Sequence, residues 1–541
     1  MDELPFRSRR SPVYGRHGMV AASQPLAAQA GLEILRRGGT AADAAVAAAA
    51  ALNVTEPTST GIGGDCFALY FDATSQTITA LNGSGRAPLA LTLDRVRREG
   101  FIDSLPPYHP HTITVPGACA GWCDLVARHG RLPLAEILEP ATRMAEEGFP
   151  VSPITAYFWD RAVERQLASA PGGLELTIEG RAPRPGEIFH NPGLARTFRR
   201  VAEGGPRAFY TGEIAGAIVH VVREAGGVLS EEDLATHRST WDEPISTTYR
   251  GVRVWECPPN GQGLAALLGL NILEGFDLAS MPPLGPRRLH VLIEAMRLAF
   301  ADARWYVCDP THFPAPLGQL LSKDYAAGRR RLIDPARANL RHLRGIPSAG
   351  SDTVYLSAVD GEGNACSFIN SNYMGFGTGI VPQGWGFSVQ NRGHCFSLDP
   401  AHPNALAPGK RPYHTIIPAI ATRADGSLYA CFGVMGGFMQ PQGHVQVLIA
   451  LIDDGLDPQA ALDRPRFCLE EGSPDDPVAI EQGIPRTTMA RLSRMGHSIV
   501  PTSGHDRAIF GRGQIILRDP ISGVLVGGSD PRADGCSAAL P

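Results

Sequence analysis

The stretch "GSDTVYLSAVDGEGNACSF" (residues 350–368) reads as a strand, a polar turn and a second strand, and the fold depends on it. In a strand, successive side chains point to opposite faces. One face of "TVYLSAV" would therefore carry Thr353, Tyr355, Ser357 and Val359, and the other would carry Val354, Leu356 and Ala358. Both faces contain apolar residues, and "ACSFI" (365–369) continues the strand pattern after the turn.

Thr353, the first residue of this expected strand, has two interpretations. Threonine favours strands, so it is ordinary as a strand start. It would instead be a nucleophile if the bond between Asp352 and Thr353 were cut. A free α-amine has a pKa of about 7.7–8.0, so at neutral pH it can serve as the base for its own residue's hydroxyl. Composition and spacing alone do not choose between the two.

The composition excludes some functions. The chain has 541 residues, enough for a large core, and its net charge of −5 argues against nucleic-acid binding as the main activity. No signal-peptide core is visible near the N-terminus, and the most apolar run (41–54) is too short to span a bilayer. The ten cysteines lack zinc-site spacing. We expect a cytoplasmic protein with reduced thiols, no membrane association and no metal or organic cofactor.

Periodicity indicates an α+β sandwich with sheets inside and helices outside. A helix is expected after Ser23 as its N-cap, ending at Gly38-Gly39, and the Ala-rich run 41–54 predicts a buried helix. Residues 66–71 and 77–81 predict a hairpin. The middle of the chain is helical in pattern, and strands dominate from residue 353 onward.

Three further features have a structural and a functional interpretation. Gly-rich stretches such as "MGGF" (435–438) are typical of tight turns, although Gly436-Gly437 could aim an N–H at an oxyanion. Arg86 is either solvated or a clamp for a carboxylate. Cys395 could pair with His394 or His414 for catalysis, but a buried structural cysteine is the simpler interpretation.

Motifs along nearly the whole chain resemble the γ-glutamyltransferase family of N-terminal-nucleophile hydrolases. The matching stretches, in family order, include "GIGGDCFALY", "GRAP", "VPGACAGW", "PPNGQG", "DTVYLSAVDGEGNA", "PGKRP", "MGGFMQPQGHVQV" and "DPRADG". The resemblance implies an αββα four-layer sandwich made as an inactive precursor. Thr353 matches the threonine before which such precursors cut themselves. The products would be a large subunit, 1–352, and a small subunit, 353–541, which stay together as one globular unit.

The resemblance also implies roles for single residues. Ser371 matches the second hydroxyl residue, which hydrogen-bonds the nucleophile. Gly436 and Gly437 match the oxyanion-hole pair, and Arg86 matches the arginine that holds the substrate's α-carboxylate.

Several positions depart from the family pattern. Cys395 stands where γ-glutamyl enzymes have an Asp for the substrate's ammonium group. His414 and Thr415 replace two serines that help to bind the γ-glutamyl group, and Tyr373 replaces an Asn. The segment "FSLDPAHPNALAPGKRP" (396–412) is shorter than in enzymes with a lid loop.

The leading expectation is a self-processing N-terminal-threonine amidohydrolase or acyltransferase acting on γ-glutamyl compounds such as glutathione. One alternative, towards which the departures point, is oxamate amidohydrolase or hydrolysis of another small carboxylate-bearing amide; an acylase for a larger acyl group is a further one. A different class is an unprocessed, non-catalytic homologue that binds a carboxylate. The expected partners are a small amide and the two subunits of one precursor, and pairing into a dimer is left open.

Overall fold

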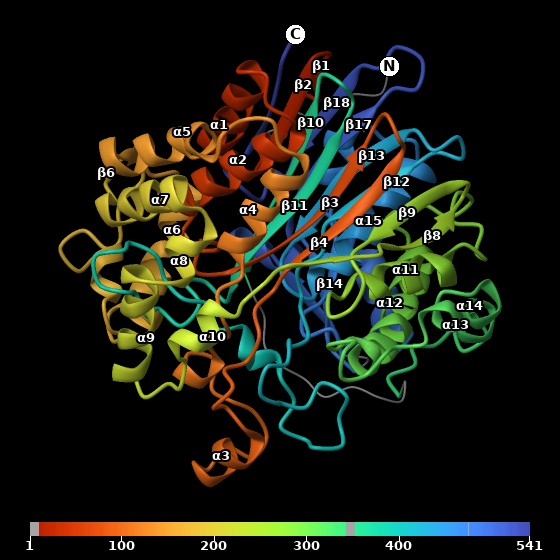
Figure 1. Cartoon of the computed structure of the whole chain (residues 1–541). Coiled ribbons are helices and arrows are strands. Elements are labelled where there is room, and N and C mark those ends of the chain that lie inside the picture. The colour runs from red at the N-terminus through yellow and green to blue at the C-terminus, as the bar shows by residue number, and fades with distance from the viewer. Residues whose placement is uncertain (1–9, 342–351, 474) are drawn as a thin grey trace.

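Two seven-stranded sheets lie face to face, and helices cover their outer surfaces (Figure 1). The computed structural model describes residues 10–341, 352–473 and 475–541. One sheet runs in the order β19 (Cys536–Ala539), β2 (Gly18–Ala22), β10 (Asp352–Asp360), β11 (Ala365–Tyr373), β3 (Asp65–Asp72), β4 (Thr77–Gly83) and β7 (Thr240–Asp242). The other runs β1 (Val13–Gly15), β18 (Leu525–Ser529), β17 (Arg512–Arg518), β13 (Leu428–Met435), β12 (Ala419–Thr422), β9 (Val252–Glu256) and β8 (Ile245–Tyr249).

Each sheet has its own layer of helices. The first sheet packs against α1 (Pro25–Arg36), α2 (Ala41–Thr55) and α4 (Ala118–His129), with α5 (Leu134–Glu147) outside them. The second packs against α11 (Gly263–Leu273), α15 (Met439–Ile452) and α16 (Pro458–Asp463), with α12 (Pro286–Tyr306) outside. The predicted αββα four-layer sandwich is therefore confirmed.

Shorter elements complete the described chain. The helices among them are α3 (Leu93–Arg98), α6 (Pro153–Ala162), α7 (Pro192–Gly204), α8 (Pro206–Tyr210), α9 (Glu213–Glu224), α10 (Glu231–Ala235), α13 (Leu317–Leu320), α14 (Lys323–Arg330) and α17 (Arg486–Arg494). The strands are β5 (Phe149–Pro150), β6 (Ile188–Phe189), β14 (Phe467–Leu469), β15 (Val478–Glu481) and β16 (Ile499–Thr502).

Strand β10 shows why the sequence requires four layers. Val354 and Leu356 belong to the apolar cluster that the sheet forms with α1 and α2. Tyr355 and Val359, on the opposite face, pack between the two sheets against residues such as Ile516. A strand that is apolar on both faces is stable only when both are covered, here by helices on one side and by a second sheet on the other.

Helix α2 is buried along its whole length, as predicted from its alanines. Thr40 and Asp43 form a reciprocal capping box at its start. The N-cap prediction for α1 is wrong by one residue, because Gln24 precedes Pro25 at the helix start. The Ser23 hydroxyl instead donates to the Glu56 carboxylate at 2.5 Å. The predicted hairpin forms as β3 and β4.

The segments before and after Thr353 alternate within both sheets. Strands β2, β3, β4 and β7 come from the first part of the chain, whereas β11 and β19 come from the second, with β10 starting at the expected cut. In the other sheet, β1 pairs with β18 and β9 pairs with β12, so β1, β8 and β9 flank β12, β13, β17 and β18. Two chains produced by a cut there would share both sheets.

Two sequence expectations bear on thiols and membranes. All ten cysteines are free thiols, and nine of them are buried. None of the helices in the described part of the chain combines the length and apolarity needed to cross a bilayer.

Candidate active site

Thr353 lies at an irregularity in the pairing of β10 with β11. Asp352 pairs with Tyr373 and Val354 pairs with Asn370, so Thr353 alone faces the two residues Ser371 and Asn372. Such bulges re-aim side chains and are common beside active sites. The Thr353 side chain is fully buried, and its Oγ1 lies 3.0 Å from Ser371 Oγ. The structure thus brings together the predicted nucleophile and its predicted hydroxyl partner.

Ser371 makes further hydrogen bonds at its hydroxyl. Its Oγ accepts from the Tyr373 N–H at 2.9 Å and from Arg392 Nη2 at 3.2 Å. Either hydroxyl can be the donor in the Thr353–Ser371 contact. When Ser371 donates, its proton stabilises negative charge that develops on Thr353 Oγ1.

Sequence reasoning did not identify Arg392, although it considered His394 and Cys395 in the same segment. The residue is fully buried. Its Nη1 donates to Thr415 Oγ1 at 2.7 Å, and its guanidinium lies over the Tyr373 ring, 4.3 Å from the centroid. The only signal in the sequence was an arginine three positions before Cys395, in an otherwise uncharged, turn-like segment. Nothing local indicated contact with Ser371.

Cys395 lies beside Tyr373 and Arg392 and carries no charge of its own. Burial raises the pKa of its thiol, although a hydrogen bond to Tyr373 and the positive charges of Arg392 and Arg304 oppose that shift. The nearby charges that act on this position are thus cationic. Tyr373 has a φ of 82°, which is unusual for a non-glycine residue and marks strain at the end of β11.

The hypothesis of a Cys-His catalytic pair finds no support among the described contacts. The Nδ1 of His394 lies 2.7 Å from the Leu105 carbonyl. The Nε2 of His414 lies 3.0 Å from Asp65 Oδ2, and its Nδ1 accepts from the Ile416 N–H at 3.4 Å. His414 is therefore a neutral donor to Asp65, and burial keeps its pKa well below the usual value.

Asp65 ties several site segments together at the start of β3. Its Oδ1 accepts from the N–H groups of Gly85 and Gly117 and from Gln390 Nε2, at distances of 2.9–3.1 Å. Asp65 also pairs in register with Ser371. Its neighbour Gly64 is required for this approach, because a Cβ there would lie 2.3 Å from the Ser371 carbonyl oxygen. The glycines of the "GIGGD" motif thus allow the chain before β3 to pack closely against Ser371, the neighbour of the nucleophile.

We predict a pH-dependent loss of stability that originates at Asp65. Burial raises the pKa of this carboxyl from 3.8 to about 7, although Arg392 and the hydrogen bonds oppose the shift. The folded chain then holds a proton that the unfolded chain releases. This stabilising contribution is complete below about pH 4 and is lost as the pH rises through about 7.

The measurement is the thermal midpoint between pH 4.5 and 8 for the wild type and for Asp65→Asn, which cannot ionise. The wild type should lose stability relative to the variant as the pH rises. A constant difference in midpoint across this range would contradict the assignment.

Gly436 and Gly437 follow β13 and have φ values of 129° and 59°, a region that favours glycine. Their carbonyls accept from the N–H groups of Met439 and Gln440. Within the described ranges, neither glycine N–H donates to a protein acceptor. Two such N–H groups in succession are what an oxyanion hole requires. The role assigned to them from the sequence stays a prediction, and the backbone is compatible with it.

Gln262 is a second residue that the sequence analysis did not single out. Its Nε2 donates to the carbonyls of Thr415 and Gly437 at 2.6 and 2.8 Å, and its Oε1 accepts from the Tyr413 hydroxyl. The Gln262 side chain thus holds Gly437 in a fixed position relative to Thr415, which Arg392 contacts.

An open cleft of about 450 Å³ leads toward this region. Its lining includes Tyr157, Phe158, Arg165 and His505, together with Gly436 and Met374. The cleft therefore reaches the glycine turn at Gly436 and the residue that follows Tyr373 in the chain. Both aromatic and charged groups therefore face a molecule that enters it.

Arg86 lines a different cavity. This cavity, of about 260 Å³, is also lined by His237, Arg238 and Gly409. Positive charge from Arg86 lowers the pKa of Arg411 and of His237, in each case as a smaller cause than burial. No hydrogen bond or ion pair joins Arg86 to Thr353, Ser371 or Arg392 in the part of the chain described. Its role as a carboxylate clamp stays a prediction.

One buried trio, His290, Glu294 and His497, has metal-like spacing. Most of its donor atoms are already engaged, although His497 Nδ1 has no hydrogen-bond partner among the described residues. His290 Nδ1 lies 2.8 Å from His497 Nε2, and Glu294 Oε2 accepts from the Asn339 N–H. We interpret the trio as a hydrogen-bonded link between α12 and the segment after α17.

Two facing sheets covered by helices, with a hydroxyl nucleophile candidate at the start of a central strand, define an enzyme of the N-terminal-nucleophile hydrolase fold. The solved cephalosporin acylase of Bacillus halodurans has this architecture. It is 48% identical, with a TM-score of 0.90 over 100% of this chain and 99% of its own.

The chain belongs to the gamma-glutamyltranspeptidase family, whose profile matches residues 27–540. The chain is 37% identical to the glutathione hydrolase-like YwrD proenzyme of Bacillus subtilis (strain 168), over 98% of this chain and 99% of the relative. It is 35% identical to the oxamate amidohydrolase proenzyme of Klebsiella pneumoniae, over 96% and 98%. The relatives carry the names of enzymes that act on amide C–N bonds, as expected from the motifs.

Proposed function

We propose that this protein is a self-processing amidohydrolase whose nucleophile is Thr353, and whose substrate carries a carboxylate but no ammonium group near the scissile amide. Oxamate is the simplest such compound. The observation that carries the substrate class is the environment of Cys395, where two guanidinium groups act on a neutral thiol.

The electrostatics disfavour γ-glutamyl substrates, the leading expectation from the sequence. An α-ammonium needs an acidic partner, and Cys395 stands where γ-glutamyl enzymes supply one. An ammonium placed there would meet the positive charges of Arg392 and Arg304, a juxtaposition that commonly costs several kcal/mol. A carboxylate would be attracted by the same two charges. The name of the oxamate amidohydrolase relative is consistent with this choice.

The proposed reaction uses the same hydroxyl twice. In the precursor, Thr353 Oγ1 attacks the carbonyl of residue 352, an N-to-O acyl shift forms an ester, and water cleaves it to free the amine. In the mature enzyme, the amine takes the hydroxyl proton as Oγ1 attacks the substrate amide. The oxyanion accepts from Gly436 and Gly437 N–H, and ammonia leaves with a proton from the Thr353 ammonium. Water then hydrolyses the acyl ester.

Processing and substrate class are tested together on purified protein. Intact-mass measurement should give two chains that separate before Thr353. Ammonia release from oxamate should then exceed release of the aniline from a γ-glutamyl anilide by at least tenfold. Added glycylglycine tests for transfer.

Each alternative has its own outcome. A single full-length chain without activity would indicate the non-catalytic homologue, and faster cleavage of the anilide would restore the γ-glutamyl assignment. Two chains without activity on either compound would point to a larger acyl group.

A further inference from the structure

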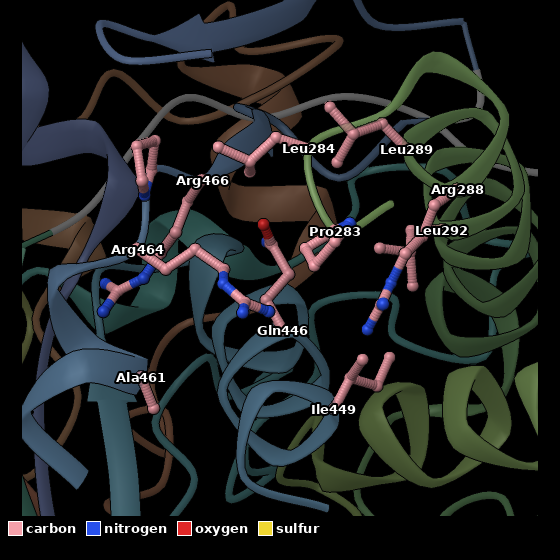
Figure 2. A pocket seen from close by; sticks show the side chains of 11 residues that line it. Pro283, Leu284, Arg288, Leu289, Leu292, Gln446, Ile449, Ala461, Arg464 and Arg466 are labelled. Carbon is pink, nitrogen blue, oxygen red and sulfur yellow. The ribbon is translucent and has the colours of Figure 1, made fainter. Parts of the chain in front are cut away.

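Arg392 differs from most of the buried arginines in having no carboxylate partner among the side chains that the structure describes. Figure 2 shows three other arginines, Arg288, Arg464 and Arg466, around a cavity of only about 20 Å³. There, Arg288 and Arg464 both pair with Asp454, and Arg466 pairs with Asp530 at 2.8 Å. Arg392 donates hydrogen bonds to the neutral hydroxyls of Ser371 and Thr415, and it also acts on the neutral Cys395 thiol. None of the ion pairs among the described side chains includes Arg392.

A fully buried cation is costly unless it is paired and hydrogen-bonded. Asp65 is the acidic group whose titration responds to Arg392. Both of its carboxylate oxygens are already bound, by two backbone N–H groups, Gln390 and His414. The counter-charge of Arg392 is therefore missing from the described side chains.

We propose that Arg392 binds the substrate's carboxylate, and that its position restricts the enzyme to short dicarboxylic monoamides. This inference rests on the proposed function and makes it more specific. The planar guanidinium stacks on Tyr373, which leaves its edge for hydrogen bonds, the geometry that suits a carboxylate. Thr415, held at its carbonyl by Gln262, orients Nη1.

The distance from the nucleophile sets the length of the substrate. Only two hydrogen bonds, of 3.0 and 3.2 Å, separate Thr353 Oγ1 from Arg392 Nη2. A carboxylate bound at Nη2 must therefore be joined to the scissile carbonyl directly or through one carbon, as in oxamate or malonamate. A γ-glutamyl group places three carbons between its α-carboxylate and the scissile carbonyl, which is too long for an extended fit.

Binding of oxalate to the processed protein tests the site without turnover. Oxalate, the diacid product expected from oxamate, should raise the thermal midpoint of the wild type. Arg392→Gln should lose this shift, and Arg392→Lys should show a smaller one. Arg464→Gln, which removes a partly buried arginine paired with Asp454, is the matched control and should keep the full shift. Arg86→Gln tests the rival clamp.

Kinetic measurements distinguish carboxylate binding by Arg392 from the general amidohydrolase activity. Arg392→Gln should lower kcat/KM for oxamate at least about 30-fold, because a buried charge pair is broken. The loss for oxamide, the neutral diamide, should be at least tenfold smaller than the loss for oxamate, because only the contact with Ser371 is shared by both substrates. The wild type should prefer oxamate and malonamate over succinamate.

Loss of the oxalate shift in Arg86→Gln but not in Arg392→Gln would overturn the proposal, as would equal losses for oxamate and oxamide. If Arg392→Gln does not accumulate as folded protein, Arg392→Lys is tested instead, by the ratio of its loss in kcat/KM for oxamate to its loss for oxamide. A wild type that neither cuts itself nor releases ammonia would refute the proposed function instead, and its oxalate shift would still report on Arg392.

Discussion

Thr353→Ala is expected to leave the chain at full length and to lower amide hydrolysis by several orders of magnitude, to the background of the assay. One hydroxyl performs both steps, and alanine supplies no oxygen for either. The Thr353 side chain is fully buried beside Ser371. The readouts are intact mass and ammonia release.

Thr353→Ser is the matched control, because it keeps the hydroxyl and removes only the methyl group. It should cut itself and retain measurable turnover. Cleavage of Thr353→Ala at the same bond would contradict the assignment of the nucleophile. Cleavage in neither variant would indicate that the fold around β10 has been disturbed, which a circular-dichroism melting curve would reveal.

Ser371→Ala should lower kcat about 10²- to 10³-fold, with a smaller change in KM, because it removes the hydroxyl that lies 3.0 Å from Thr353 Oγ1 and can donate to charge that develops there. It also leaves the Tyr373 N–H and Arg392 Nη2 without this acceptor. Self-cleavage should slow as well, and a time course of intact mass after expression would measure it.

Ser367→Ala distinguishes this effect from the loss of any buried serine on β11. Ser367 lies on the same face of the strand, and its Oγ bonds Tyr355 and accepts from the Ala419 N–H. Its loss should reduce stability without a comparable fall in kcat. Equal kinetic losses in the two variants would mean that Ser371 acts only through the structure.

Local periodicity predicted the parts of the fold that local sequence encodes. The alternation in "TVYLSAV" correctly assigned Tyr355 to one apolar layer and Leu356 to the other. The alanines of α2 predicted burial because only a helix packed on all sides can be apolar all round. Ser23 was misassigned, because its hydroxyl is used by Glu56, a partner 33 positions away in the chain.

The site was predictable only where a motif carried it. Thr353, Ser371 and the glycine pair came from the resemblance, and no pattern within the strands indicated their chemistry. Arg392 could not be found in this way. Its role depends on a contact with Ser371, 21 positions away, which forms only when the turn after β11 folds back. Cys395 was recognised as a departure, but the positive charge around it became visible only in three dimensions.

The interleaving of the two segments within both sheets has a consequence for the mature protein. Before the cut, refolding is a reaction of one chain, and its yield at equilibrium does not depend on concentration. After the cut, neither piece can complete a sheet alone, so recovery from denaturation becomes an encounter of two molecules that scales with protein concentration. Self-cleavage would thus replace reversible folding of one chain by kinetic stability, so the lifetime of the mature enzyme is set by its rate of unfolding.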